Sequence, residues 1–291
     1  MIIIRIWEGL GNQLFQYAFA KSLQHHTSEL VVLDCKKSFQ NSLPGAKTSI
    51  VQREYRLDYF QIRLAKIDIK QYRCWNFLQR ANPLQQAAFN LSEKGLFPFR
   101  YVRDKSAYDY NEAMFHLHHA YVMGYFQNER YFREIRKELL SDLTPKNFCL
   151  NARAKDLLSS PNTISLHIRR TDFQNLGIAL DNAYYQKAVD YMNSLVNDPV
   201  YLIFSDDVEW AKKHIDCNAK TYYASDLGDF SDCDDLMLMS LCAHNITSNS
   251  TFSWWGAWLN QNEDKIVISP KRWITKSRGS YKIIPKEWVK I

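Results

Sequence analysis

The chain has 291 residues, of which 46% are hydrophobic and 23% charged, which excludes a mostly disordered protein and leaves room for two domains. Its net charge of +6 suits a phosphate-bearing ligand but is too diffuse to predict a nucleic-acid-binding protein. Since no run approaches the roughly 18 apolar residues of a membrane span and the first residues form no basic leader, we expect a cytoplasmic protein.

The first half of the sequence predicts an α/β domain, which we assign to residues 1–150. Residues 2–7 are mostly apolar and predict a strand, and a glycine-containing turn follows. Apolar residues then recur at helical spacing from Leu14 to Leu23, before a second short apolar run at 30–33. This βαβ pattern favours a parallel sheet. Further along, we expect a basic amphipathic helix over 61–95, a strand over 121–126 and a helix ending near 140.

The second half, residues 151–291, predicts a second domain in which strands and helices alternate more regularly. Apolar runs that predict strands occupy 163–168, 199–204, 220–223, 245–247 and 266–269. Predicted helices lie over 183–195, 207–214, 236–243 and 253–259. The fold class is therefore α/β, with two domains of this kind.

Polar residues follow three predicted strands of the second domain. Arg169 and Arg170 follow the first, residues 205–207 (SDD) the second, and residues 248–251 (SNST) the fourth. Ligands of open parallel sheets bind beyond the carboxyl ends of the strands. Arginine side chains and helix N-termini bind phosphate, and carboxylates accept hydrogen bonds from ribose or guanine. The pattern predicts a nucleoside-diphosphate site, although a solvated arginine pair and helix caps remain alternatives.

The N-terminal turn leaves a second enzyme class open. Gly9 and Gly11 follow a predicted strand, and Asp34 lies at the distance at which dinucleotide-binding folds place an acidic residue. Leu14 stands where the third glycine of that fingerprint belongs. An NAD-dependent oxidoreductase is the alternative function, and a non-catalytic sugar- or nucleotide-binding protein is a third.

No metal site is predicted from the sequence. The histidines within 116–119 have the wrong spacing for one helix face, and the six cysteines form no C-x-x-C pair. Residues 232–235 (DCDD) resemble the D-x-D metal motif of one class of sugar transferases, but they precede a predicted helix, where capping is an equal explanation.

Five segments of the sequence stand out together: 9–18 (GLGNQLFQYA), 124–127 (GYFQ), 167–172 (HIRRTD), 204–207 (FSDD) and 248–257 (SNSTFSWWGA). In this order they resemble one known family, the bacterial α-1,2-fucosyltransferases of glycosyltransferase family eleven. The resemblance runs along nearly the whole chain and is most specific in the third and fifth segments.

The resemblance implies a GT-B fold, in which two Rossmann-like domains face each other across a cleft. Residues 151–291 would bind the donor GDP-fucose, and 1–150 would shape the acceptor side. The implied reaction is an inverting, metal-independent transfer of L-fucose from GDP-β-L-fucose to the 2-hydroxyl of a terminal galactose. The partners would be a nucleotide sugar and a galactose-terminated glycan, without a cofactor. Basic segments at 63–80 and 271–290 could touch an anionic membrane at its inner face, but solvated surfaces explain them better.

The resemblance also implies roles for individual residues. Arg169 and Arg170 would contact the pyrophosphate, and we expect Arg170 to neutralise the charge that develops there. Asp172 is the candidate base, although two neighbouring arginines make it a weak one and it could instead orient them. The remaining assignments are His167 against the nucleotide, Asp206 near the nucleoside, Asp235 on guanine, Ser250 and Thr251 on the β-phosphate, and Asn12 and Gln13 facing the reacting centre from the acceptor side, with Asn12 counted among the catalytic residues.

Overall fold

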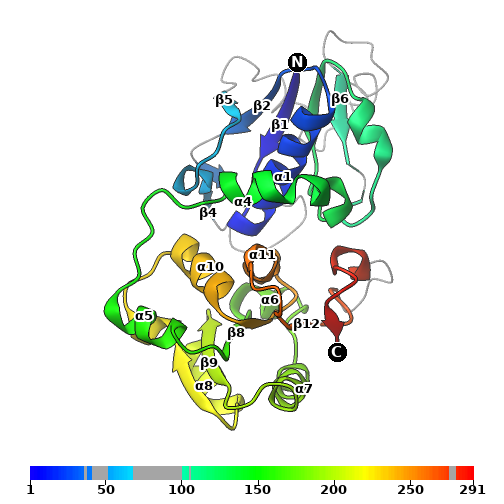
Figure 1. Ribbon diagram of the computed structural model, residues 1–291. Coiled ribbons are helices and arrows are strands. Elements are labelled where there is room, and N and C mark those ends of the chain that lie inside the picture. Colours follow the sequence, from blue (N-terminus) through cyan, green and yellow to red (C-terminus); the bar gives the residue numbers. More distant parts are fainter. Residues whose placement is uncertain (36–37, 41–51, 68–99, 105, 275–279) are drawn as a thin grey trace. The chain divides into compact units, whose positions relative to one another are not determined.

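The computed structural model describes residues 1–35, 38–40, 52–67, 100–104, 106–274 and 280–291. The chain divides into two compact units, Met1–Pro145 and Lys146–Ile291. Each unit is built on its own parallel sheet, and the two are described in turn (Figure 1). None of the described helices is both long and apolar enough to cross a membrane.

Unit 1 contains a five-stranded parallel sheet in the order β5-β2-β1-β7-β6. The β1 strand is apolar and buried, and α1 carries a buried apolar stripe that packs beside β1 and β2. A second helix, α4, joins α1 through a hydrogen bond from Tyr17 to Asp142. The strands are β1 (Ile2–Ile6), β2 (Val31–Cys35), β5 (Ala65–Ile67), β6 (Arg100–Arg103) and β7 (Ala120–Met123); the helices are α1 (Leu10–His26) and α4 (Arg136–Asp142), and β3 (Ser38–Gln40) pairs with β4 (Gln52–Glu54) in a separate hairpin.

Unit 2 contains a six-stranded parallel sheet in the order β10-β9-β8-β11-β12-β13. Counted along the chain, these strands lie in the order 3-2-1-4-5-6 of a nucleotide-binding Rossmann sheet. The strands are β8 (Thr163–Ile168), β9 (Val200–Ser205), β10 (Lys220–Tyr223), β11 (His244–Ile246), β12 (Val267–Ser269) and β13 (Val289–Lys290). The helices are α5 (Ala152–Leu158), α6 (Thr171–Asn175), α7 (Asn182–Asn193), α8 (Val208–His214), α9 (Ala224–Leu227), α10 (Asp232–Leu241) and α11 (Thr251–Leu259).

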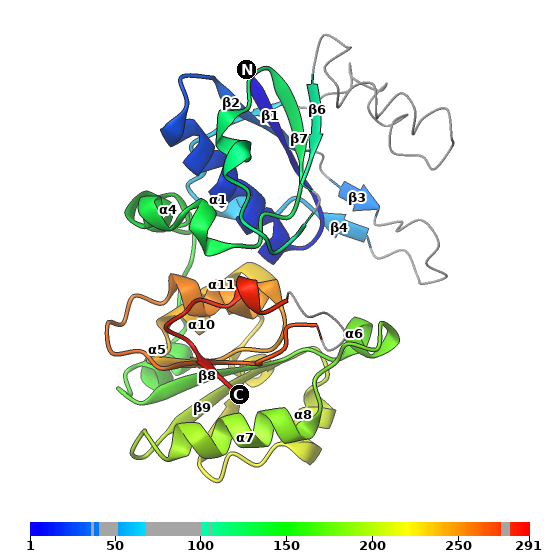
Figure 2. The same cartoon turned by 90° about the vertical axis from the view of Figure 1, so that its right-hand side faces the viewer.

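Both faces of the unit 2 sheet are covered. Figure 2 shows α7 and α8 on one face and α10 and α11 on the other. Residues of β9 alternate accordingly: Tyr201 and Ile203 join the core beneath α7, whereas Leu202 and Phe204 join the core beneath α10. This double burial explains why β8 and β9 are nearly continuous apolar runs.

The strand order creates a topological switch point in each unit. In unit 2 the chain leaves β8 toward β9 and later returns to the other side of β8 with β11. In unit 1 the corresponding switch point lies at the ends of the neighbouring strands β1 and β7. Ligands of doubly wound sheets bind outside the carboxyl ends of the strands at such points.

Most predicted elements are confirmed, and the exceptions have local causes. Residues 65–67 form β5 instead of helix, and the rest of the predicted helix beyond residue 67 lies outside the described residues. Helices α10 and α11 begin earlier than predicted because Ser231 and Ser250 cap them. Ser253, the first residue of the predicted helix over 253–259, lies inside α11. The short strands β6 and β13 were not predicted.

Candidate active site

Two buried side chains, one from β8 and one from the loop after β11, lie next to each other at the switch point of unit 2. His167 Nδ1 lies 2.8 Å from the Ser248 hydroxyl, and both residues are buried. Burial, together with the charge of Arg169, lowers the pKa of His167 to about 3. The imidazole is therefore neutral at physiological pH and offers hydrogen bonds instead of charge.

Arg169 is held by two carboxylates next to this pair. Its Nε and Nη2 donate to the two oxygens of Asp172 at 2.9 Å each, a bidentate geometry. Asp206, which directly follows β9, lies 3.3 Å from Arg169 Nε. Asp206 also accepts hydrogen bonds from the Arg170 backbone at 2.8 Å and the Thr171 hydroxyl at 2.7 Å. The two carboxylates thereby fix the arginine loop above the sheet edge.

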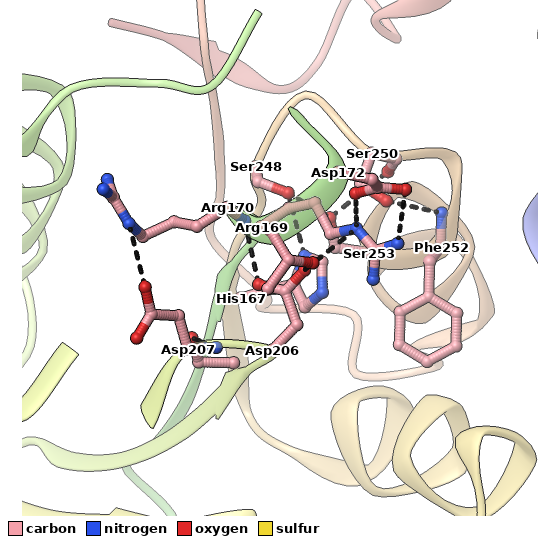
Figure 3. Close-up of polar contacts among 12 residues, drawn as sticks. His167, Arg169, Arg170, Asp172, Asp206, Asp207, Ser248, Ser250, Phe252 and Ser253 are labelled. Carbon is pink, nitrogen blue, oxygen red and sulfur yellow. Dashed lines mark hydrogen bonds and ion pairs between the residues drawn. The ribbon is translucent and has the colours of Figure 1, made fainter. Parts of the chain in front are cut away.

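Arg170 extends in the opposite direction from Arg169 (Figure 3). Its guanidinium lies over the Trp210 ring, 3.7 Å from the centroid, and its Nε lies 3.5 Å from an Asp207 oxygen. That Nε is buried and has no hydrogen-bond partner among the described residues. A buried donor left unbonded costs roughly 1–3 kcal/mol, so an anionic ligand at this point would gain a ready partner.

A helix N-terminus faces the same edge. Ser250 caps α11, accepting a hydrogen bond from the Phe252 backbone at 3.3 Å, and Thr251 is the first helical residue. First-turn backbone N–H groups and the helix dipole favour an anion here. The predicted phosphate-binding residues Arg169, Ser250 and Thr251 are thus gathered beyond the ends of neighbouring strands β8 and β11.

A pocket of about 440 Å³ opens beyond the ends of β9 and β10, lined in part by Ser205, Gly228, Asp229, Phe230 and Asp235. Burial, reinforced by the charges of Asp232 and Asp234, raises the pKa of Asp235 to about 7. A pocket of this size with one half-buried carboxylate suits a flat, hydrogen-bonding ring such as a nucleobase.

In unit 1, the sequence-predicted residues Asn12 and Gln13 begin α1. Gln13 is fully buried and its amide bonds the backbone of Glu8, Glu54 and Arg56, so it fixes the turn to the chain after β4. Asn12 bonds Glu8 through its Nδ2 at 2.6 Å and accepts a hydrogen bond from Gln127 at 2.7 Å. Asn12 therefore bridges the loops that follow β1 and β7.

The features that suggested a dinucleotide site have internal roles. Asp34 is buried and accepts a hydrogen bond from the Tyr121 hydroxyl at 2.7 Å. Leu14, at the third glycine position, is fully buried in α1. Asp34 is therefore not available to bind a ribose, and the Leu14 side chain occupies the place where the fingerprint needs a glycine.

Three residues of the unit 2 edge were missed or undervalued from sequence. Trp210 was taken only as part of a helix, and neither Ser248 nor Asp207 was assigned a specific contact. The SDD segment at the end of β9 was the available signal for Asp207, because a carboxylate within two residues of a strand end lies near the same edge. Within the described part of the chain, no group of three His, Cys, Asp or Glu side chains could hold a metal ion.

Arginines, a capped helix N-terminus and a pocket at one edge of a doubly wound unit are the features expected of a nucleotide-binding α/β protein of the GT-B class. The model of glycosyl transferase family 11 matches residues 1–291, and the chain belongs to this family. It is a glycosyltransferase, so the oxidoreductase alternative is wrong.

Two similar proteins come from Escherichia coli. An alpha-1,2-colitosyltransferase is 31% identical, covering 100% of this chain and 99% of its own. The O-antigen biosynthesis glycosyltransferase WbnK is also 31% identical, covering 97% and 98%. Among solved structures, an Arabidopsis thaliana FUT1 mutant in complex with GDP has a TM-score of 0.51 and 10% identity, covering 91% of this chain and 69% of that one. That likeness supports the fold alone.

Proposed function

We propose that the protein is an inverting, metal-independent α-1,2-fucosyltransferase that moves L-fucose from GDP-β-L-fucose to the 2-hydroxyl of a terminal β-galactose. The observation that carries the proposal is the convergence of Arg169 and the N-terminus of α11 at the switch point of unit 2, with Arg170 next to Arg169 in the same loop. The family and the full-length likeness to an alpha-1,2-colitosyltransferase support the linkage.

In this proposal unit 2 binds the donor. The α11 N-terminus and Arg169 hold the diphosphate, and Asp235 accepts the N–H donors of guanine in the neighbouring pocket. His167 and Asp206 act mainly by fixing the loops that carry these groups. Asp172 remains a predicted base, but its bidentate bond to Arg169 favours an orienting role.

Departure of GDP from fucose leaves a cationic sugar and a diphosphate that gains negative charge. The unbonded Nε of Arg170 supplies a donor for that charge once the side chain shifts from Trp210 toward the ligand. Since the donor and acceptor react in one displacement, the configuration at the anomeric carbon inverts.

A second donor is favoured by a specific observation. The full-length relative named as an alpha-1,2-colitosyltransferase raises a nucleotide-linked colitose as an alternative donor. The linkage and the acceptor position would be the same, so donor preference is a separate question from the reaction type.

The test is GDP release from each donor with lactose as acceptor and EDTA present, with the product linkage read by NMR. We expect a new α-1,2-linked sugar on galactose and unchanged rates in EDTA. Donor binding without any transfer to galactosides would contradict the acceptor assignment, and an absence of GDP binding would contradict the donor site itself.

A further inference from the structure

A half-buried carboxylate lies at the switch point of unit 1 and has no role in the donor chemistry above. Glu8 is the second residue after β1, and Tyr125 is the second after β7. The Tyr125 hydroxyl donates to Glu8 Oε1 at 2.7 Å, and Asn12 Nδ2 donates to Oε2 at 2.6 Å. The bond from Tyr125 joins the loops that follow β1 and β7, the position at which a doubly wound sheet receives its ligand.

The backbone at Glu8 is strained. Its φ is +67°, in the left-handed region that glycine adopts freely and longer side chains avoid. The adjacent Gly9 has a φ of −72°, so the chain places glutamate where a glycine would sit without strain. Strained residues cluster at functional sites, so this backbone angle points to a function for Glu8.

The carboxylate retains capacity for another hydrogen bond. Each oxygen accepts one hydrogen bond from the described residues, whereas an ionised carboxylate offers about four acceptor positions. Burial raises the pKa of Glu8, and the hydrogen bonds from Tyr125 and Asn12 and the charge of Arg53 on β4 counteract it. Trp7 packs against Tyr125 with ring centroids 4.9 Å apart and supports the phenol from the other strand end.

We propose that Glu8 is the general base of the reaction, an inference that rests on the proposed function. Its carboxylate accepts the proton of the acceptor hydroxyl while that oxygen bonds to the anomeric carbon. The bond from the anomeric carbon to the phosphate oxygen breaks in the same step, and its electron pair leaves with GDP. Unit 1 would accordingly recognise a neutral, hydroxyl-bearing sugar at the Glu8 edge.

The first test compares Glu8→Gln with wild type in transfer from GDP-fucose to lactose. Glutamine keeps the size, and its oxygen can still accept from Asn12 while its Nε2 donates to the Tyr125 oxygen, so the fold should survive. We expect kcat to fall by about 10²–10⁴, the usual contribution of a positioned base, and the Kd for GDP to stay within about twofold. The matched control is Glu54→Gln, an exposed glutamate of the same unit, which should keep normal turnover.

A second variant guards against misfolding. Glu8→Gly fits the local φ without strain and should be folded by thermal melting, with a loss of transfer similar to that of Glu8→Gln.

The pH profile separates catalysis from a structural role. Tyr125→Phe removes a hydrogen bond that lowers the pKa of Glu8, so the acid limb of kcat should move to higher pH, and the limb should vanish in Glu8→Gln. If Glu8 only supported the fold, the acid limb would stay in place in both variants. If wild-type protein and Glu8→Gln both transfer fucose at similar rates, this inference alone is overturned. If wild-type protein transfers no sugar, the proposed function and this inference are both overturned.

Discussion

The two units use the same kind of sheet and equip its switch point differently. In unit 2 the edge carries charged groups in opposition, two arginines against the carboxylates of Asp172, Asp206 and Asp207. In unit 1 the edge carries amide and phenol groups around one carboxylate, Glu8. A diphosphate needs cations and N–H donors, while a neutral sugar needs hydrogen-bond partners for hydroxyls, so the contrast matches donor and acceptor binding.

The units also differ in where they bury charge. In unit 1 the fully buried Asp142 on α4 accepts from Tyr17 and pairs with Lys21 and Arg63, each at 3.0 Å. This cluster joins α1, α4 and the chain at residue 63. In unit 2 the ion pairs of Arg169 and Arg170 lie at the carboxyl edge of the sheet itself. We infer that charge mainly supports the fold in unit 1 and ligand binding in unit 2.

The largest expected effect tests whether the buried charge of Asp142 stabilises the fold of unit 1. Asp142→Ala leaves a buried hydroxyl and two cations without their shared partner, so the free energy of unfolding should fall by about 3–5 kcal/mol. Urea denaturation measures it. Glu138→Ala removes an exposed carboxylate 3.9 Å from Lys21 and should cost under about 0.5 kcal/mol. Equal losses in both variants would contradict the assignment.

The next effect concerns unit 2. Arg170→Ala should lower kcat by at least about 10², the scale for removing one preorganised donor to a developing charge. Steady-state GDP release measures it, with Lys212→Ala on the neighbouring α8 as a control that keeps its activity. Near-normal turnover in Arg170→Ala would refute the role given to its unbonded Nε.

A smaller effect decides what Asp172 does. Asp172→Asn removes the charged partner of Arg169 but preserves its size, so a residue that orients Arg169 should weaken donor binding by about 10–100-fold, the value of a hydrogen bond to a charged group. The Kd for GDP-fucose and kcat are measured together. Normal donor affinity with slow turnover would instead identify Asp172 as the base and weaken the case for Glu8.

Much of this contrast could be read from the sequence because it depends on strand ends. From the sequence alone, apolar runs followed by polar residues predict that Arg169, Asp206 and Ser250 lie at one edge of a sheet, and βα alternation predicts the fold class. Side-chain direction was not accessible, because Arg169 and Arg170 are adjacent in sequence and yet point to different partners. The role of Glu8 was missed because its signal is a backbone angle, and no residue pattern encodes a φ of +67°.

The smallest effect tests the proposed guanine pocket of unit 2 through the pH dependence of GDP-fucose binding. The pKa of Asp235 is raised to about 7 in the free protein, and guanine N–H donors need the ionised carboxylate. Below pH 7 a growing fraction of Asp235 carries a proton that binding must release, so affinity for GDP-fucose should fall up to about tenfold per pH unit. GDP-fucose is the proper probe because its diphosphate is esterified at both ends and does not titrate there.

Asp235→Asn supplies the control for that titration. The affinity of this variant for GDP-fucose should be lower than that of wild type at pH 8 and independent of pH between 5.5 and about 8, as calorimetry would measure. The unliganded protein gives an independent check of the same pKa. Because folded Asp235 holds a proton that the unfolded chain releases between about pH 4 and 7, its contribution to stability declines as pH rises through that window. Unliganded Asp235→Asn should therefore melt higher than wild type at pH 8, and a lower melting temperature would show that Asp235 pairs with a group other than guanine.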